Sequence, residues 1–172
     1  MIADASIITR IQTAAMLDSL QQGVDGPLGG DLQLDTDAMT RTWEQTIARP
    51  AQPGYRVLSA LNGGRVVGFS ATVPSQPVEG NEWLSQPGIE IIALEVEASA
   101  VGEGHRSRLL AACTDLAIEE GAHIVSTWII AGDDARIRLF HEAGLRPGGL
   151  QRVLPVGPHR ISQHLWWAQL GQ

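Results

Sequence analysis

The segment from Ile89 to Leu110 constrains the fold most, because its sequence predicts a strand, then a turn, then a helix. Residues 89–96 are mostly apolar and rich in isoleucine and valine, which predicts a buried strand. Gly102 and Gly104 then indicate a turn, and Leu109 begins the apolar face of a helix. A buried strand that leads through a glycine turn into a helix is typical of mixed α/β proteins.

Further strand and helix signals lie on both sides of this segment. Asn62-Gly63-Gly64 predicts a tight hairpin between strands, because Asn and Gly accept positive φ easily. No repeat or linker divides the 172 residues, so one domain over 1–172 is expected. The expected strands are 55–61, 66–73, 89–96, 123–130, 150–156 and 161–170; the expected helices are 13–22, 35–49, the stretch from the glycine turn to about 120, and 133–143; residues 6–12 are either a first strand or the start of a helix.

Composition excludes several classes of function. The net charge of −7 argues against broad binding of nucleic acid and against docking on anionic lipid. The single cysteine, Cys113, shares a helical face with Leu109 and Leu116, which indicates a core residue, and the histidines lack zinc-site spacing. The first residues do not resemble a signal peptide, and no apolar stretch approaches the roughly 20 residues of a membrane helix. A cytoplasmic protein without a metal is expected.

The glycine turn predicts an anion site. Unpaired N–H groups and the dipole at the start of a helix attract anions, and glycines let a phosphate approach the backbone. Arg106 and Arg108 add positive charge. Two alternatives are an ordinary helix start and a dinucleotide-binding fingerprint. The fingerprint fits less well, because Ser107 stands where its third glycine belongs and the segment lies in the middle of the chain.

With its flanks, the segment resembles the pyrophosphate-binding motif of the GNAT superfamily, the acyl-CoA-dependent N-acyltransferases. That motif runs Leu-x-Val, a short turn, Arg/Gln-x-x-Gly-x-Gly/Ala, and a helix with paired leucines. This chain has Leu94-Glu95-Val96, then Val101-Gly102-Glu103-Gly104-His105-Arg106, then Leu109-Leu110. The stretch from Asp133 to Leu145 resembles a second family motif, Asn-x-x-Ala-x-x-Leu-Tyr-x-x-x-Gly-Phe. The resemblance covers residues 55–156 well and the N-terminal third loosely.

The resemblance implies a GNAT-like α/β (α+β) domain with a central mixed, mostly antiparallel sheet. About six to seven strands and about four flanking helices are expected. The donor would be acetyl-CoA or a similar acyl-CoA, the acceptor a small-molecule amine or a peptide, and a homodimer is left open. The residues implied in cofactor binding are Leu94, Glu95 and Val96 along the pantetheine arm, Gly102, Glu103, Gly104, His105, Arg106 and Ser107 around the pyrophosphate, and Asp133.

The same resemblance indicates which positions could be catalytic. Phe140 replaces the tyrosine that many members use as general acid, and Trp128 replaces the glutamate that some members use as base. Another branch has its base at the start of the motif strand, where this chain has Glu90. We therefore expect Glu90 to be the general base, acting through water, although it could equally be a solvated charge. Glu95 either faces the acceptor cleft or sits at a bulge.

The expected reaction is direct attack of an amine on the acyl-CoA in a ternary complex, because no covalent nucleophile is visible. Val101 and Arg106 depart from the motif, at positions where the family has Arg or Gln and a small residue. The altered Arg106, together with Phe140 and Trp128, keeps two alternatives open. One is a CoA-binding module without catalysis, and the other is a protein that retains the fold for assembly, with Trp166 and Trp167 at an interface.

Overall fold

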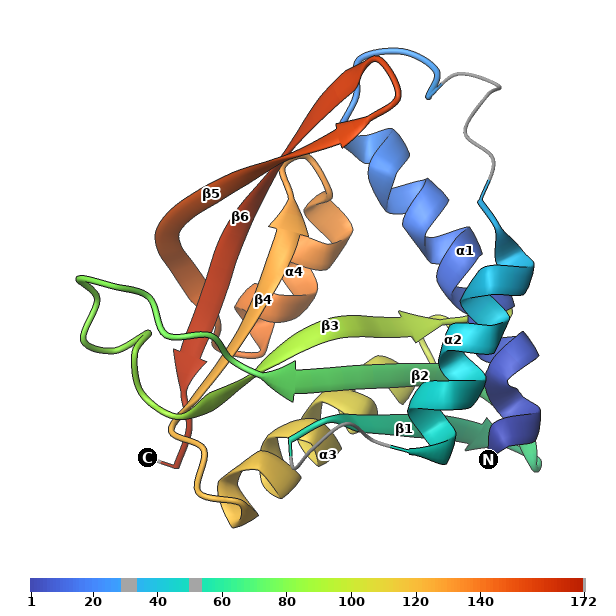
Figure 1. Cartoon of the computed structure of the whole chain (residues 1–172), viewed down its shortest axis with the longest axis horizontal. Coiled ribbons are helices and arrows are strands. Elements are labelled where there is room, and N and C mark those ends of the chain that lie inside the picture. The colour runs from blue at the N-terminus through green and yellow to red at the C-terminus, as the bar shows by residue number, and fades with distance from the viewer. Residues whose placement is uncertain (29–33, 50–53, 172) are drawn as a thin grey trace.

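The computed structural model describes residues 1–28, 34–49 and 54–171, and in this part of the chain helices flank one six-stranded sheet (Figure 1). This architecture confirms the mixed α/β fold class, with four α-helices and six strands among the described residues. The helices are η1 (Ile2–Asp4), α1 (Ala5–Gln22), α2 (Thr36–Ala48), η2 (Ala98–Ala100), α3 (His105–Glu119) and α4 (Asp134–Glu142), and the strands are β1 (Arg56–Asn62), β2 (Arg65–Pro74), β3 (Gly88–Val96), β4 (Ile124–Ile130), β5 (Arg146–Val156) and β6 (His159–Gln169).

Residues 6–12 belong to helix α1, so the alternative of a first strand is wrong and the helix expected over 13–22 begins earlier. Ile8 and Ile11 lie three residues apart, which places both on one helical face. That face is buried in a cluster with Phe69 and Ala93 of the sheet. This burial outweighs the strand preference of the β-branched residues.

Helix α2 begins where the sequence predicts. The Asp35 side chain accepts a hydrogen bond of 2.8 Å from the Ala38 N–H, which caps the helix. Trp43 on its buried face packs edge-on against Phe69, with 5.3 Å between the ring centroids, and its Nε1–H donates to Gln12. Helices α1 and α2 therefore pack on the same face of the sheet.

The strand order is β1-β2-β3-β4-β6-β5, and only the β3–β4 pair is parallel among the described strands. The predicted hairpin joins β1 to β2, with φ of 57° at Gly63 and 82° at Gly64. β5 begins at Arg146, earlier than predicted, because Pro147 and two glycines hide the strand signal. The register of β5 against β6 shifts between Pro147 and Gln151.

The sheet divides between β3 and β4. The two strands pair only over Gly88–Glu90 and Ile124–Ser126, and beyond this they diverge (Figure 1). The Thr127 hydroxyl still donates to the Ile91 carbonyl at 2.9 Å, just past the last pair. Glu90 is therefore the last residue of β3 that pairs with β4 before the strands separate.

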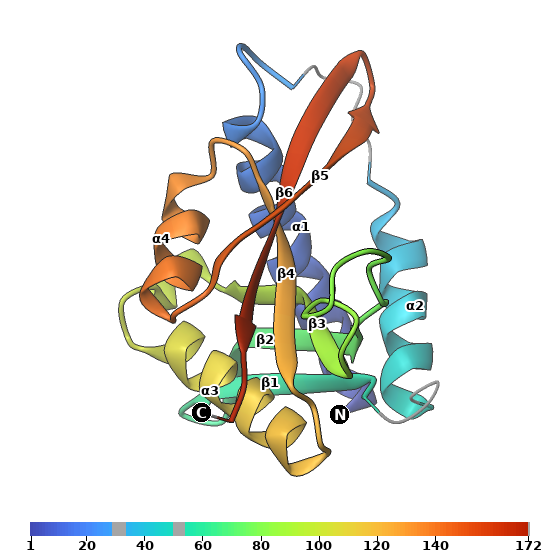
Figure 2. The ribbon, with the colours of Figure 1, turned by 90° about the vertical axis from the view of Figure 1, so that its left-hand side faces the viewer.

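The two faces of the sheet carry different helices. Figure 2 shows α3 and α4 on one side and α2 on the other. Leu94 and Val96 share a buried cluster with Leu109 of α3 and Phe140 of α4, which makes Phe140 a core residue. Cys113 is 2% exposed in the same cluster, which confirms it as a core residue, and burial raises the pKa of its thiol. Trp166 and Trp167 are also buried, which confirms that they are packing residues.

Candidate active site

The glycine turn leads into α3 without a side-chain cap. Gly102 and Gly104 have φ of 91° and 77°, in the left-handed region that side chains disfavour. Gly104 is the N-cap of α3, and no described side chain bonds to the N–H groups at this end. The first intrahelical bond joins the Arg108 N–H to the Gly104 carbonyl. The N–H groups at the start of α3 therefore remain available to an anion.

The main chain of β3 presents a second set of available groups. The Glu97 N–H donates to the Val67 carbonyl of β2 at 2.8 Å. Hydrogen-bonding direction alternates along a strand, so Glu95 also points its main-chain groups at β2. Leu94 and Val96 point theirs the opposite way, toward the gap left by β4. Of the three strand residues expected to pair with a cofactor, Leu94 and Val96 thus offer their main chain, whereas the main-chain groups of Glu95 face β2.

These two sets of groups meet at a cavity of about 810 Å³. The wall is built from α1, the C-terminal end of β3, the glycine turn and α4. Arg106 lines this cavity, and its buried Nε has no hydrogen-bond partner among the described residues. A buried unpaired donor of a cation indicates an anion as its missing partner.

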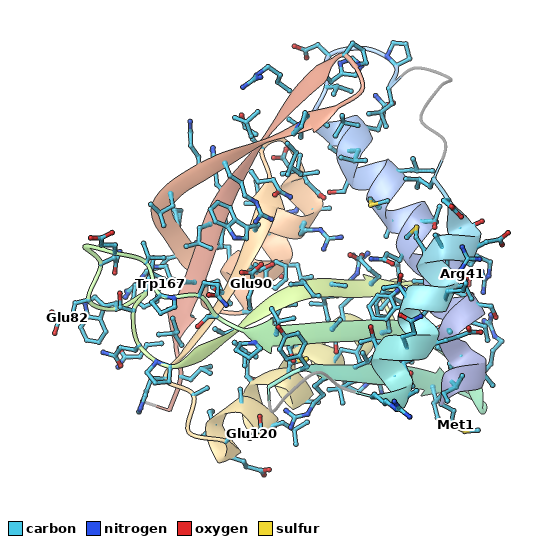
Figure 3. All side chains as sticks on the ribbon, in the orientation of Figure 1. Met1, Arg41, Glu82, Glu90, Glu120 and Trp167 are labelled. Atoms are coloured by element: carbon cyan, nitrogen blue, oxygen red, sulfur yellow. The ribbon has the colours of Figure 1, made fainter. Side chains whose placement is uncertain are left out.

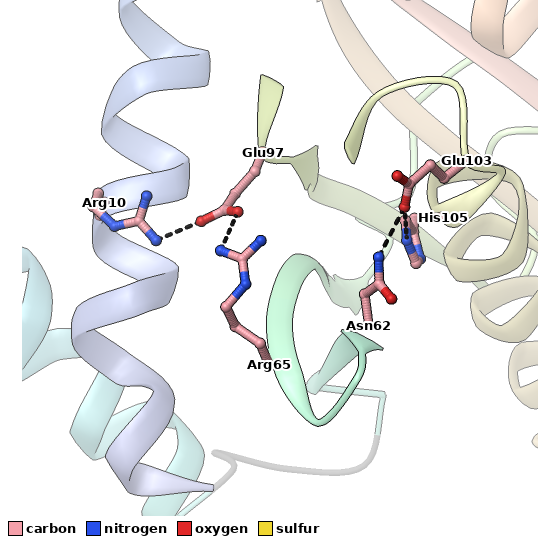
Figure 4. A network of polar contacts seen from close by, with 6 residues as sticks. All are labelled: Arg10, Asn62, Arg65, Glu97, Glu103 and His105. Carbon is pink, nitrogen blue, oxygen red and sulfur yellow. Dashed lines mark hydrogen bonds and ion pairs between the residues drawn. The ribbon is translucent and has the colours of Figure 1, made fainter. Parts of the chain in front are cut away.

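Besides Arg106, two further arginines lie on the wall of the cavity toward α1. Arg10 of α1 and Arg65 of the β1–β2 hairpin both donate to the Glu97 carboxylate, at 2.5 and 2.7 Å (Figure 4). The hydrogen bond from Arg10 and then that from Arg65 lower the pKa of Glu97 below its ordinary value. All three residues line the cavity. In this structure, the Glu97 carboxylate therefore holds two arginines that a phosphate could bind instead.

Two turn residues direct their side chains away from the cavity. Glu103 Oε2 contacts His105 Nε2 at 3.2 Å and accepts from the Asn62 side chain at 3.0 Å (Figure 4). The Arg108 guanidinium contacts His105 Nδ1 on the other side of the ring. These side chains tie the turn to the hairpin, so His105 can serve an anion only through its main chain. The Glu103 N–H already donates to the Ala100 carbonyl at 3.4 Å, so Glu103 does not offer the free N–H that was expected of it.

Asp133 lies on the wall formed by α4. Its Oδ1 accepts from the Arg136 N–H at 3.1 Å, which caps the helix, and its Oδ2 accepts from the Ser19 hydroxyl at 2.5 Å. The Arg136 Nε lies 3.4 Å from the same Oδ2. This buried carboxylate therefore joins α1 to α4 and orients Arg136.

Arg136 reaches across the gap between α4 and β3. Its Nη2 donates to both carboxylate oxygens of Glu95, at 2.9 and 2.8 Å. Burial alone would lower the pKa of Arg136, but the charges and hydrogen bonds of Glu95 and Asp133 outweigh it and raise that pKa. Glu95 is 7% exposed and paired, so it is not free to act as a base. The bulge lies elsewhere, at Ile92, since Ala71 pairs with Ala93 and Thr72 with Ile91.

Glu90 lies where the sheet divides. It pairs with Val73 of β2 on one side and Ser126 of β4 on the other. Figure 3 shows Glu90 between β3 and the half of the sheet formed by β4 and β6. Burial raises the pKa of Glu90, and the charge of Arg152 on β5 lowers it by a smaller amount. A half-buried carboxylate with a raised pKa is suited to accept a proton near neutral pH.

Four arginines of this region were not predicted as site residues. Arg10, Arg65 and Arg152 come from elements far from the motifs, and no local pattern indicates their positions. The position of Arg136 could have been noticed in the sequence, because it falls on the alanine position of the second motif. A large cation at a position where the family has a small residue predicts a partner of opposite charge nearby.

Comparison with known proteins settles the family. The family model described as Acetyltransferase (GNAT) family matches residues 25–145, which is most of the chain. The chain belongs to the GNAT family. It is accordingly an acyltransferase of the kind that uses acetyl-CoA, as the motifs predicted. No curated protein sequence matches this GNAT chain.

Solved structures share the GNAT fold over nearly the whole chain. A ribosomal-protein-alanine N-acetyltransferase from Brucella melitensis is 24% identical, with a TM-score of 0.65 over 99% of this chain and 96% of that one. The protein yncA from Salmonella typhimurium, solved with its cofactor acetyl-CoA, is 23% identical, with a TM-score of 0.68 over 100% and 91%. An N-acetyltransferase from Staphylococcus aureus Mu50 is 18% identical, with a TM-score of 0.61 over 93% of each chain. In the described part of this GNAT protein, no helix has the length and apolar character needed to cross a membrane.

Proposed function

We propose that this chain transfers an acetyl or related acyl group from acyl-CoA to an amine by direct attack in a ternary complex. The observation that carries the proposal is the convergence of two sets of available main-chain groups on one cavity. One set is the uncapped N-terminus of α3, and the other is the edge of β3 at Leu94 and Val96. One sheet with helices on both faces supports the action of residues 1–172 as a single domain.

The residues around the cavity suit an acyl-CoA. The pyrophosphate needs N–H donors and positive charge, which the N–H groups of Gly102 and of Gly104 to Ser107 and the unpaired Arg106 Nε provide. The pantetheine amides need strand-like partners, which Leu94 and Val96 provide. Bound acetyl-CoA supplies the activated acyl group. Among the other predicted cofactor residues, Glu95 and Asp133 act on this cavity by holding Arg136 in its wall.

Glu90 is the proposed general base. An amine is a nucleophile only after it loses its ammonium proton, and a carboxylate with a raised pKa accepts that proton, directly or through one water. Glu90 lies on β3 at the division of the sheet, four residues before Leu94. The proton acceptor and the main-chain groups that hold the donor therefore lie on the same strand.

The experiment is a transfer assay with acetyl-CoA and a panel of amines, with Glu90→Gln as the test variant. We expect loss of roughly 100-fold or more in kcat/KM, which is the usual contribution of a general base, with unchanged affinity for acetyl-CoA. Glu82→Gln is the matched control, because Glu82 is an exposed carboxylate on the loop before β3. Equal rates for the native chain and Glu90→Gln would remove Glu90 from the mechanism. Tight binding of acetyl-CoA without transfer to any amine would favour a CoA-binding module instead.

A further inference from the structure

A second cavity of about 570 Å³ lies between α2 and strands β1–β3. We call it the apolar pocket, and the residues that define it are Ala38, Met39 and Trp43 of α2, Val57, Val73 and Ile92. Figure 1 shows α2 crossing in front of β1 and β2 on this face of the sheet. The volume is in the range of roughly 300–1,000 Å³ that small-molecule sites have in proteins. None of the acyl-CoA residues described above lines this pocket.

Most of the polar side chains on its wall already have partners, and the Tyr55 hydroxyl is the main exception among the described residues. The Thr42 hydroxyl donates to the Ala38 carbonyl at 2.9 Å, and the Thr72 hydroxyl donates to the Gly54 carbonyl at 3.4 Å. The Gln12 amide oxygen accepts from the Trp43 indole at 2.8 Å. Asp35 caps α2, and Arg56 pairs with Glu120. Such a wall favours a hydrocarbon over a polar or charged group, which would lose hydration without gaining partners.

The apolar pocket lies on the face of the sheet to which Glu90, the proposed base, points. Ile89 and Ile91 are buried on the α3 face of the sheet, so Glu90 between them points to the opposite face, where α2 lies. Ile92 at the bulge lines the pocket and is 54% exposed, which is unusual for a large apolar side chain within a central strand. Glu90 therefore lies beside the apolar pocket, about two strand residues or roughly 7 Å along β3 from Ile92.

Charge also restricts the acceptor. Beyond Glu90, the next carboxylates are Glu95 on β3 and Glu97 directly after it, and arginines pair with both. Asp35, the carboxylate that lines the pocket, is occupied as a helix cap. An acceptor with several positive charges would find few carboxylates here that lack a partner.

We propose that the acceptor is a primary amine that carries an apolar group, and that the apolar pocket holds this group while the amine meets Glu90. The proposal rests on the proposed function and names its substrate class. The reaction breaks the bond from the acyl carbon to the sulfur of CoA and forms one to the nitrogen of the amine. The ammonium first gives one proton through Glu90 to solvent, and after attack the nitrogen loses a second proton, which solvent passes to the sulfur so that CoA departs as the thiol.

Leucinamide and serinamide test the proposal, because the same α-amino group carries an apolar side chain in one and a polar side chain in the other. We expect kcat/KM to be at least about tenfold higher for leucinamide, from burial of its side chain. Thr42→Trp fills the pocket from α2 and should remove this preference while leaving the affinity for acetyl-CoA unchanged. Glu44→Trp, on the exposed side of the same helix, is the matched control.

A binding measurement makes the test independent of turnover. Saturation-transfer NMR should show leucinamide bound to the native chain and to Glu44→Trp, weakened with Thr42→Trp, and serinamide bound to none of them. Equal binding or equal turnover of the two amides, or a preference that survives Thr42→Trp, would overturn the proposal. Failure of the proposed function has a different signature, in which leucinamide binds in the apolar pocket but acetyl-CoA does not bind or no transfer occurs.

Discussion

Arg136 of α4 donates to both carboxylate oxygens of Glu95 of β3, at 2.9 and 2.8 Å, in the wall of the proposed acyl-CoA cavity. It does so from a position where the GNAT motif has alanine. The pair is largely buried, with side-chain exposures of 19% and 9%. The ion pair joins the β3 side of the cavity to the α4 side, and it also neutralises a carboxylate that would otherwise repel an anionic donor.

Arg136→Ala should destabilise the protein even though it restores the small residue of the motif. The change leaves Glu95 buried without its partner, and such losses typically cost about 3–5 kcal/mol. Urea unfolding followed by circular dichroism measures the loss. The double variant Glu95→Gln with Arg136→Gln removes both charges and should recover most of it. A single variant as stable as the native chain would show that the pair is solvated and contributes little.

Arg10 and Glu97 should have opposite effects on the affinity for acetyl-CoA. Arg10→Ala removes a cation from the cavity wall, and we expect roughly threefold to tenfold weaker binding. Glu97→Gln releases Arg10 and Arg65 to the phosphates, so binding should tighten. Calorimetric titration measures both effects.

Arg41→Ala is the control for net charge, because Arg41 is an exposed arginine on α2 (Figure 3). It should leave the affinity unchanged at moderate salt. If Arg10→Ala and Glu97→Gln both weaken binding, the cluster serves only to hold the hairpin against α1.

The pH dependence of transfer should report on Glu90 and Arg152. Glu90 accepts a proton only when ionised, so kcat/KM falls on the acid side as pH drops through its pKa, which burial places above the ordinary value. The charge of Arg152 lowers that pKa. Arg152→Gln should therefore raise it and move the acid limb of the profile to higher pH.

Arg152→Lys keeps the charge and should leave the limb near its native position. The comparison between variants removes the contribution of the amine, whose own ionisation is the same in every assay. A limb that is identical in Arg152→Gln and in the native chain would contradict the role of Glu90.

The elements near the motifs were predictable because local chemistry dictates them. Asn62-Gly63-Gly64 forms the hairpin by its tolerance of positive φ, and Asp35 caps α2 by a bond three residues away. Residues 6–12 were ambiguous, because their β-branched side chains favour a strand locally. Only the buried partners of Ile8 and Ile11 on the sheet, which are distant in sequence, select the helix.

The geometry of the candidate site was predictable at the glycine turn, where the local sequence determines the main chain, and not where side chains distant in sequence meet. The glycine turn and its helix follow directly from Gly102 and Gly104. The pairing of Glu97 with Arg10 and Arg65 joins residues 87 and 32 positions apart, and no periodic pattern indicates such a contact. The same holds for Arg152, whose charge acts on Glu90 from another strand.

The most direct test of the account is a calorimetric titration of acetyl-CoA into the native chain, Gly104→Val and Gly121→Val. Both glycines have positive φ, 77° and 83°, and open space where a Cβ would stand, so the two variants carry similar backbone strain. Gly104 caps α3 at the cavity, whereas Gly121 lies beyond the opposite end of that helix. We predict micromolar or tighter binding by the native chain and Gly121→Val, and none by Gly104→Val. Equal binding by all three proteins, or by none, would contradict the acyl-CoA site at the glycine turn.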